Sequence, residues 1–363
     1  MALAKKLAAS GPPCPASARE EGFADPVAYQ AAIKAAREGF GGAGAEDDPA
    51  ASALIAAVEA AQLLPPEVAL EFEAAQFEEL VGGARSASLR HLYAAERRAP
   101  RHFGASGPAQ LTTIAVVGRG GAAAGLAISA LDAGLQVVLV DPDGDGPQAQ
   151  ATGAEVARTY HAAAQAGHMT EEHRKSRLAR LKVTDTLSVI RAGDLAVLLP
   201  LSGSDGATLI EAACAHTREG TALLVMGQLP PAFAAAAGAR AADLAAILFE
   251  RPAHLARMGE IALPENASPA TEAAALGLMR RLRMIAVGAR GRQVLSRHLL
   301  LALRRACDEM LALGTSPYAI DAALRAAGIG HGAYLGIDAM GLRASAFLAE
   351  SGLPEGEAHE AVS

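Results

Sequence analysis

The sequence predicts an α/β fold, in which a doubly wound parallel sheet lies between an N-terminal helical segment and an all-α C-terminal domain. Between residues 111 and 288, short apolar runs alternate with helical patterns, and such alternation builds a parallel sheet covered by helices on both faces. A glycine-rich turn separates the first apolar run from the first helix. After residue 288 the strand patterns stop, and Gly314, Gly328 and Gly341 divide a helical region that extends to about residue 350.

The N-terminal part of the chain predicts helices rather than strands. Residues 1–22 are expected to form a flexible tail, and residues 23–105 a helical segment. Apolar residues recur at helical spacing over residues 26–37, 50–63 and 66–81, with a linker rich in Gly and Asp at residues 40–49. A second tail is expected at residues 351–363.

The first βα turn has the pattern of a dinucleotide-binding loop. An apolar run at residues 114–117 predicts a buried strand, and residues 121–133 predict the helix that follows. Gly118, Gly120 and Ala123 occupy the three special positions of G-x-G-x-x-G/A. The first glycine permits a tight turn, the second lets the backbone approach a pyrophosphate, and the third position needs a small residue for helix packing. The phosphates would lie at the helix N-terminus.

An acidic residue after the second strand indicates which dinucleotide binds. Residues 136–140 predict this strand, and Asp141 lies 21 residues after Gly120. A carboxylate at this place accepts hydrogen bonds from the adenosine ribose hydroxyls and would repel the 2′-phosphate of NADP. The sequence therefore predicts a Rossmann-type domain at residues 111–288 with NAD as its cofactor. Further buried strands are expected at residues 195–199, 222–226 and 285–287.

Composition narrows the classes of function. The net charge of −7 and the absence of a dense basic cluster argue against a nucleic-acid partner. Cys14, Cys214 and Cys307 lie far apart without metal-ligand spacing, as expected for reduced thiols in a cytoplasmic protein without a metal site. No segment reaches about 18 uncharged apolar residues, so no membrane association is expected.

Further motifs follow one another along residues 60–350. They are Glu71-x5-Phe77-x2-Leu80 and Leu89-Arg-His-Leu-Tyr93 in the helical segment, Val116-Val-Gly-x-Gly120 with Val140-Asp141, Gly167-x-Met-Thr-Glu-Glu172, Arg251-Pro-Ala-His-Leu-Ala-Arg-Met-Gly-Glu-Ile261, Ser316-Pro-Tyr-Ala-Ile-Asp321, and Gly332-Ala-Tyr-Leu-Gly-Ile-Asp-Ala-Met-Gly-Leu342. In this order the motifs resemble the 3-hydroxyacyl-CoA dehydrogenase family. The N-terminal helices resemble the segment that joins the enoyl-CoA hydratase and dehydrogenase halves of multifunctional fatty-acid oxidation proteins.

This resemblance implies an oxidoreductase of fatty-acid metabolism. The family oxidises an L-3-hydroxyacyl-CoA to the 3-ketoacyl-CoA in β-oxidation, with hydride transfer to NAD. It also implies an acyl-CoA substrate or ligand and a homodimer formed through the helical domain at residues 289–350. Other β-oxidation subunits are further candidate partners.

The residues that perform this reaction in the family are mostly replaced here. The family's base is a His that opens an HFFxP motif; the Pro corresponds to Pro252, which places the base at Leu248, a side chain that cannot accept a proton. The supporting carboxylate, twelve residues later, is retained as Glu260. The family's Ser and Asn fall on Gly227 and Ser296. The acidic pair and the Lys that follow the strand at residues 195–199 in the family are also missing.

Two interpretations remain open. In the first, the chain is a divergent but active NAD-dependent L-3-hydroxyacyl-CoA oxidoreductase that uses Glu260, His254 or a water in place of the lost His. In the second, it is a pseudoenzyme that keeps the cofactor turn and has weak or no dehydrogenase activity. The second is favoured because polar residues are lost together from one site while the scaffold persists. His254 is then a histidine on the surface or next to the residues that line the site, and Glu260 a solvated or helix-capping carboxylate.

Overall fold

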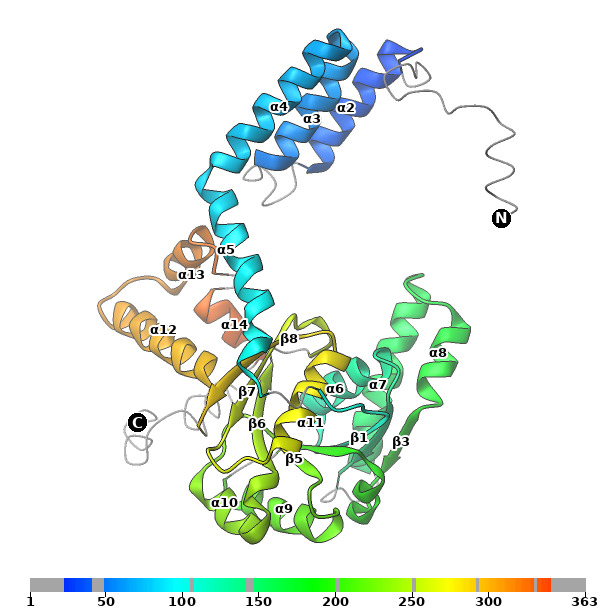
Figure 1. Cartoon of the computed structure of the whole chain (residues 1–363), viewed down its shortest axis with the longest axis vertical. Helices are drawn as coiled ribbons and strands as arrows, with labels where there is room; N and C mark the ends of the chain where they lie inside the picture. The colour runs from blue at the N-terminus through cyan, green and yellow to red at the C-terminus, as the bar shows by residue number, and fades with distance from the viewer. Residues whose placement is uncertain are drawn as a thin grey trace. The chain divides into compact units, whose positions relative to one another are not determined.

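The computed structural model describes residues 23–40, 49–104, 108–141, 147–199, 203–249, 253–291, 294–329 and 332–340. The chain divides into two units, Met1–Ala95 and Glu96–Ser363 (Figure 1). The two expected tails lie outside the described residues, and so does most of the linker expected at residues 40–49.

The first unit consists of helices, as predicted. They are α2 (Pro26–Phe40), α3 (Pro49–Leu63), α4 (Pro66–Gly82) and most of α5 (Ala84–Arg98). Helix α3 packs against both α2 and α4, with Ile33 and Ile55 buried in this small core. Apolar side chains such as Leu70 and Phe77 remain exposed on α4.

The second unit is built on one eight-stranded sheet in the order β3-β2-β1-β4-β5-β6-β7-β8. The strands are β1 (Thr113–Val117), β2 (Gln136–Val140), β3 (Leu181–Thr184), β4 (Leu195–Leu198), β5 (Ala222–Met226), β6 (Leu244–Phe249), β7 (Met258–Leu263) and β8 (Ile285–Arg290). Neighbouring strands are parallel except β6 and β7, which are antiparallel. The predicted Rossmann-type fold is confirmed. The order of the strands reverses between β1 and β4, and ligands of such sheets bind at the carboxyl ends beside that point.

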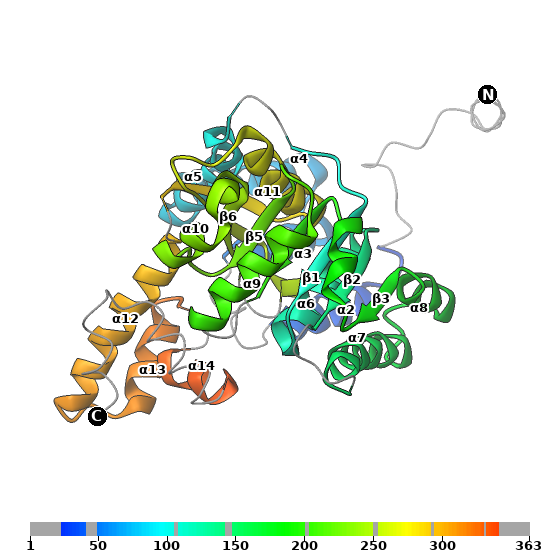
Figure 2. The same ribbon diagram turned by 90° about the horizontal axis from the view of Figure 1, so that it is seen from below.

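Helices cover both faces of the sheet (Figure 2). They are α6 (Gly120–Asp132), α7 (Pro147–Gln165), α8 (Glu171–Leu178), α9 (Gly203–His216), α10 (Pro231–Ala237) and α11 (Pro269–Arg281). Because successive strand residues point to opposite faces, Ile114 and Val116 share one core with α6 and α11. Ala115 and Val117 share the other core with α9 and α10. Every β1 residue after Thr113 is buried, which explains the uninterrupted apolar run.

Three helices follow the sheet: α12 (Leu295–Ala312), α13 (Pro317–Ala326) and α14 (Ala333–Met340). Gly314 and Gly328 adopt positive φ angles of 91° and 82° after α12 and α13, as expected of glycines that end helices. The third predicted break, Gly341, lies outside the described residues. Asp321 accepts hydrogen bonds from the backbone N–H groups of Tyr334 and Leu335. The bond from Tyr334 lowers the pKa of the Asp321 carboxyl, so this anchor of α14 persists at neutral pH.

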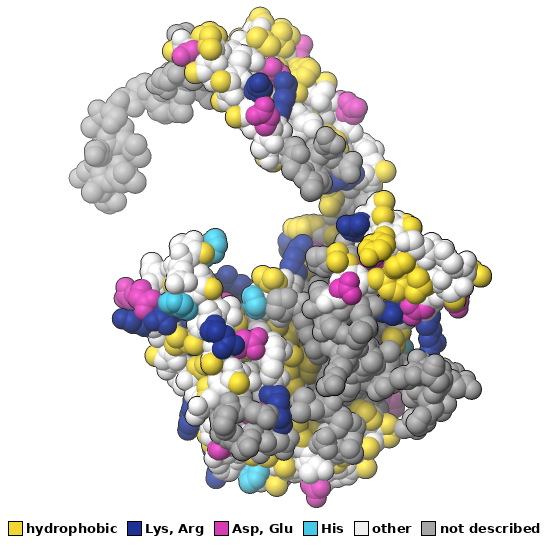
Figure 3. Space-filling model, turned by 180° about the vertical axis from the view of Figure 1, so that it is seen from behind, with side chains coloured by type: hydrophobic (Ala, Val, Ile, Leu, Met, Phe, Trp, Pro, Cys, Tyr) yellow, Lys and Arg dark blue, Asp and Glu magenta, His cyan; other side chains and the backbone are white. Residues whose placement is uncertain are grey.

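None of the helices in the described ranges is long and apolar enough to span a bilayer. On the face shown in Figure 3, acidic and basic side chains are interspersed.

Candidate dinucleotide site and neighbouring active-site positions

The turn between β1 and α6 depends on two glycines with left-handed backbone angles. Gly118 has φ 140° and Gly120 has φ 76°. A Cβ on Gly118 would lie 2.8 Å from the Cβ of Leu199, whereas a Cβ on Gly120 would meet nothing within 4 Å. The first glycine therefore permits close packing against the end of β4. The second leaves open space in front of the helix N-terminus, where a pyrophosphate can approach the backbone. Ala123 is fully buried in the core beneath α6.

These angles give a direct test of the turn. Gly118→Ala is expected to raise the Kd for NADH at least about tenfold and to lower the free energy of unfolding by about 1–3 kcal/mol, because it forces a strained angle as well as a clash. Gly121→Ala is the matched control: Gly121 lacks a positive φ, and an added Cβ would make an ordinary contact 3.5 Å from Glu155. Fluorescence titration with NADH and urea unfolding measure both quantities. Equal effects of the two substitutions would contradict this role of Gly118.

Asp141 lies where the ribose partner is expected. It directly follows β2, its side chain is 1% exposed, and its backbone N–H donates to the carbonyl of Thr184. Neither carboxylate oxygen accepts a hydrogen bond from any described residue. The guanidinium of Arg119 forms an ion pair with Asp141, with Nη2 3.4 Å from Oδ1. A buried carboxylate without hydrogen bonds is costly, so the two ribose hydroxyls of a dinucleotide would supply the missing donors.

Gly118, Gly120, Ala123 and Asp141 thus fit the adenosine half of NAD. Bound NAD would supply the acceptor or donor for a hydride at its nicotinamide ring. The protein's part is to hold the dinucleotide at the carboxyl end of β1 and β2.

Two residues of this site are not predicted from the sequence. Thr152, on α7 and 3% exposed, accepts a hydrogen bond of 3.1 Å from the N–H of Gly120. No motif indicates that α7 returns to the turn; Gly153 makes this possible by packing closely against Val183. Arg119 is visible in the sequence between the two glycines, but only the fold shows that its side chain reaches Asp141.

The structure brings together the four positions matched to the family's substrate-side residues. Leu248 and Glu260 are directly opposite each other in the antiparallel β6–β7 pair. The N–H of Gly227 donates to the carbonyl of Ile247, one residue before Leu248. Ser296, in the first turn of α12, donates to Glu260. The matched positions therefore form one site in space.

Glu260 is held by the N-terminus of α12. Glu260 is buried, with 3% of its surface exposed. Oε1 accepts a hydrogen bond from the N–H of Leu295, and Oε2 accepts from the N–H and the hydroxyl of Ser296 at 3.0 Å and 2.6 Å. The first N–H groups of a helix have no intrahelical acceptor, and a carboxylate there also interacts favourably with the helix dipole. In this structure Glu260 thus acts as a cap for α12.

Leu248 packs with the core on the α9 and α10 side of the sheet. Among the described residues, no histidine forms a hydrogen bond with Glu260, whose partners are Leu295 and Ser296. His254 is exposed on the short helix η5 (Ala253–Leu255), which contacts α6 and buries Ala253 in the opposite core. The structure does not bring His254 to Glu260.

One further family position differs structurally from what the sequence match suggests. Gly227 has φ 115°, an angle that a serine rarely adopts, so restoring the family's Ser there would strain the backbone. Pro252, which sets the register of the match, lies outside the described residues. In the part of the chain that the structure describes, no three His, Cys, Asp or Glu side chains are grouped so as to hold a metal ion.

The chain was compared with known proteins. The family model described as the NAD-binding domain of 3-hydroxyacyl-CoA dehydrogenase matches residues 113–291. FadB2 of M. tuberculosis has a similar fold, with a TM-score of 0.61 and 19% identity, covering 67% of this chain and 87% of that one. The (S)-3-hydroxybutyryl-CoA dehydrogenase PaaH1 of Ralstonia eutropha has a TM-score of 0.59 and 21% identity, covering 67% and 87%. A search of curated proteins found no match.

The fold and the glycine turn define a dinucleotide-binding protein of the Rossmann class. Residues 113–291 form an NAD-binding domain of the 3-hydroxyacyl-CoA dehydrogenase family. The expected family, fold and cofactor are confirmed. At identities of 19% and 21%, the similarity to the two solved structures concerns the fold alone.

Proposed function

We propose that this chain binds NAD in a degenerate 3-hydroxyacyl-CoA dehydrogenase site and has weak or no dehydrogenase activity. The observation that supports this most is the position of Glu260. Its carboxylate caps α12 through three hydrogen bonds, and the residue opposite it is Leu248.

The family's reaction explains why this matters. When a hydride leaves C3 of a 3-hydroxyacyl-CoA, the proton of the 3-hydroxyl must pass to a base in the same step. Leu248 cannot accept that proton, and no histidine in the described part of the chain forms a hydrogen bond with Glu260. A displaced base is a poor substitute, because a misplacement of about 1 Å can cost on the order of a hundredfold in rate.

We further propose that an acyl-CoA is the ligand beside the dinucleotide and that the chain forms a homodimer through α12–α14. Leu299 and Leu313 are 72% and 86% exposed on this helical region, which supports an apolar interface. The unpaired thiols of Cys214 and Cys307 support a cytoplasmic location. Sedimentation showing only monomer at micromolar concentration would contradict the dimer.

The proposal separates binding from turnover, so both are measured on the wild-type chain. Calorimetric titration is expected to show saturable NADH binding, and acetoacetyl-CoA should bind to the NADH complex. In a steady-state assay, the loss of NADH absorbance with acetoacetyl-CoA should not exceed the rate in buffer. Turnover at the several reactions per second typical of enzymes would instead support a divergent active dehydrogenase.

A further inference from the structure

The N-terminus of α6 is capped by a side chain from another helix. Gly120 is the first residue of α6, and the residue before it, Arg119, forms no side-chain hydrogen bond that caps the helix. The N–H of Gly120 instead donates to the hydroxyl of Thr152 on α7 over 3.1 Å. Thr152 is buried, with 3% of its surface exposed, so this bond lies in the interior, where hydrogen bonds are stronger than in water.

This bond leaves the following N–H groups of α6 for a ligand. The first N–H groups of a helix have no intrahelical acceptor. Thr152 takes that of Gly120, and those of Gly121 and Ala122, next in the first turn, are then the donors for a pyrophosphate. A Cβ on Gly120 would meet nothing within 4 Å. Thr152 therefore contacts the turn without filling the space that the ligand needs.

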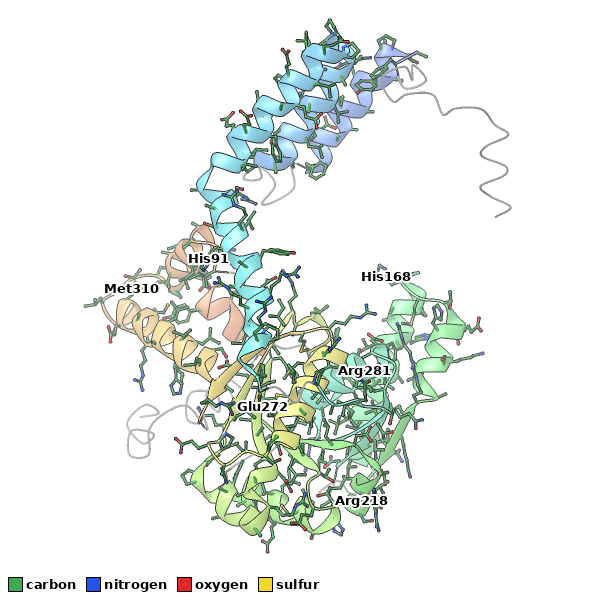
Figure 4. The ribbon with its side chains drawn as sticks, viewed as in Figure 1. His91, His168, Arg218, Glu272, Arg281 and Met310 are labelled. Carbon is green, nitrogen blue, oxygen red and sulfur yellow. The ribbon has the colours of Figure 1, made fainter. Side chains whose placement is uncertain are left out.

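The position of α7 depends on Gly153, the residue after Thr152. A Cβ on Gly153 would lie 2.8 Å from Cγ2 of Val183 on β3, which is closer than such atoms can pack. The missing side chain therefore lets α7 approach the sheet closely at the point where Thr152 reaches the turn. From there α7 runs to the connection that contains His168, labelled in Figure 4.

We propose that Thr152 is a positioning residue for the pyrophosphate of the dinucleotide and that Gly153 keeps it in place. By accepting from Gly120, the Thr152 hydroxyl holds the first turn of α6 in the conformation that binds phosphate. Without this bond the turn populates other conformations, and the apparent affinity falls with the fraction that remains competent. The inference rests on the proposed binding of NAD and requires no catalytic step.

Two ligands separate the pyrophosphate from the rest of the site. Adenosine contains the ribose that Asp141 would bind, and adenosine 5′-diphosphate (ADP) adds the two phosphates. Calorimetry on the full chain measures the binding of both without turnover. The wild-type chain is expected to bind ADP at least about tenfold more tightly than adenosine.

Substitutions of Thr152 test the hydroxyl itself. Thr152→Val keeps the branched shape but removes the acceptor, so it should weaken ADP binding about fivefold to twentyfold and adenosine binding less than about twofold. Thr152→Ser restores the hydroxyl and should bind ADP within about threefold of the wild type. Thr159→Val is the matched control, because the hydroxyl of Thr159 on the same helix donates to the carbonyl of Glu155. It should change neither affinity.

Substitutions of Gly153 test the same contact from the position of α7. Gly153→Ala should displace the helix from β3 and weaken ADP binding about as much as Thr152→Val. Val183→Ala removes the methyl group that the new Cβ would meet, so adding it to Gly153→Ala should restore ADP binding. Thr152→Val and Gly153→Ala combined should bind ADP no more weakly than either alone, because both act through one hydrogen bond.

Several results would overturn the proposal. One is equal weakening of ADP and adenosine by Thr152→Val, as a general loss of stability would cause. Another is a Thr152→Ser chain that binds ADP as weakly as Thr152→Val. If Thr152→Val does not fold, the Gly153→Ala series decides, and failure of Val183→Ala to restore ADP binding refutes the proposal.

The same measurements distinguish this proposal from the binding of NAD. A wild-type chain that binds neither ADP nor NADH at millimolar concentration refutes the dinucleotide site itself. Wild-type affinity for ADP in the Thr152→Val chain refutes only the role of Thr152.

Discussion

Leu248→His is expected to raise the rate of acetoacetyl-CoA-dependent NADH oxidation by about 10²- to 10⁴-fold over the wild-type chain, the usual contribution of a positioned general acid or base. Residue 248 faces Glu260 directly across the antiparallel β6–β7 pair, where Cβ atoms lie about 4.5–5.5 Å apart. An imidazole at this position can donate one ring N–H to the carboxylate and use the other nitrogen to exchange a proton with the substrate oxygen. Absorbance at 340 nm measures the rate.

A polar control separates proton transfer from better solvation of the site. Leu248→Asn places a side chain there that forms hydrogen bonds but does not titrate, and its rate should stay at the wild-type level. Ser296→Asn added to Leu248→His should raise the rate further. Gly227→Ser should be left out, because φ at Gly227 is 115° and a serine there would destabilise the fold. If Leu248→His and Leu248→Asn have the same rate, the missing base does not explain the lost activity.

Glu260→Ala is expected to lower the free energy of unfolding by about 2–4 kcal/mol, because the substitution removes a helix cap and leaves buried donors without an acceptor. The donors are the backbone N–H groups of Leu295 and Ser296 and the hydroxyl of Ser296. Glu260→Gln keeps one carbonyl oxygen as an acceptor, so its free energy of unfolding should fall less than that of Glu260→Ala. Urea unfolding followed by circular dichroism measures the difference.

Glu265→Ala is the matched control for this loss of stability. Glu265 is an exposed acid just after β7, and its removal should change the free energy of unfolding by less than about 0.5 kcal/mol. NADH binding should be retained in Glu260→Ala at low urea, because the dinucleotide turn belongs to β1 and α6. A Glu260→Ala chain as stable as the wild type would refute the capping role.

The dinucleotide turn was predictable because its determinants are local in sequence. Gly118 and Gly120 are required by backbone angles that other residues rarely adopt. Asp141 directly follows the last apolar residue of the second strand, so the end of that strand can be located in the sequence. The parallel sheet was predictable because short apolar runs alternate with helical patterns along the sequence. The short strand β3 was not predicted, because it is only partly buried. Strand β6 was not predicted either, because it follows an alanine-rich run in which the spacing of apolar residues does not distinguish a strand from a helix.

The substrate side of the site was predictable only as a set of aligned positions. Resemblance placed Leu248 opposite a retained Glu260, but the start of α12 at Leu295 depends on a carboxylate 35 positions earlier in the sequence. Such a cap from another element has no local pattern, unlike a Ser or Asp that precedes its own helix. For the same reason, the pairing of Arg119 with Asp141 and the return of Thr152 to the turn emerged only from the fold.

The central claim is that the NAD-binding scaffold remains while proton transfer is lost, and a deuterium-transfer measurement tests it most directly. Wild-type chain in excess over acetoacetyl-CoA is incubated for hours with NADH deuterated at both C4 positions, and the acyl-CoA is analysed by mass spectrometry. Hydride transfer would place deuterium at C3 of 3-hydroxybutyryl-CoA, with a proton added to the oxygen. We predict little or no deuterated product in the wild type after hours, and rapid formation of product with Leu248→His. Deuterated product forming within seconds in the wild type would contradict the account.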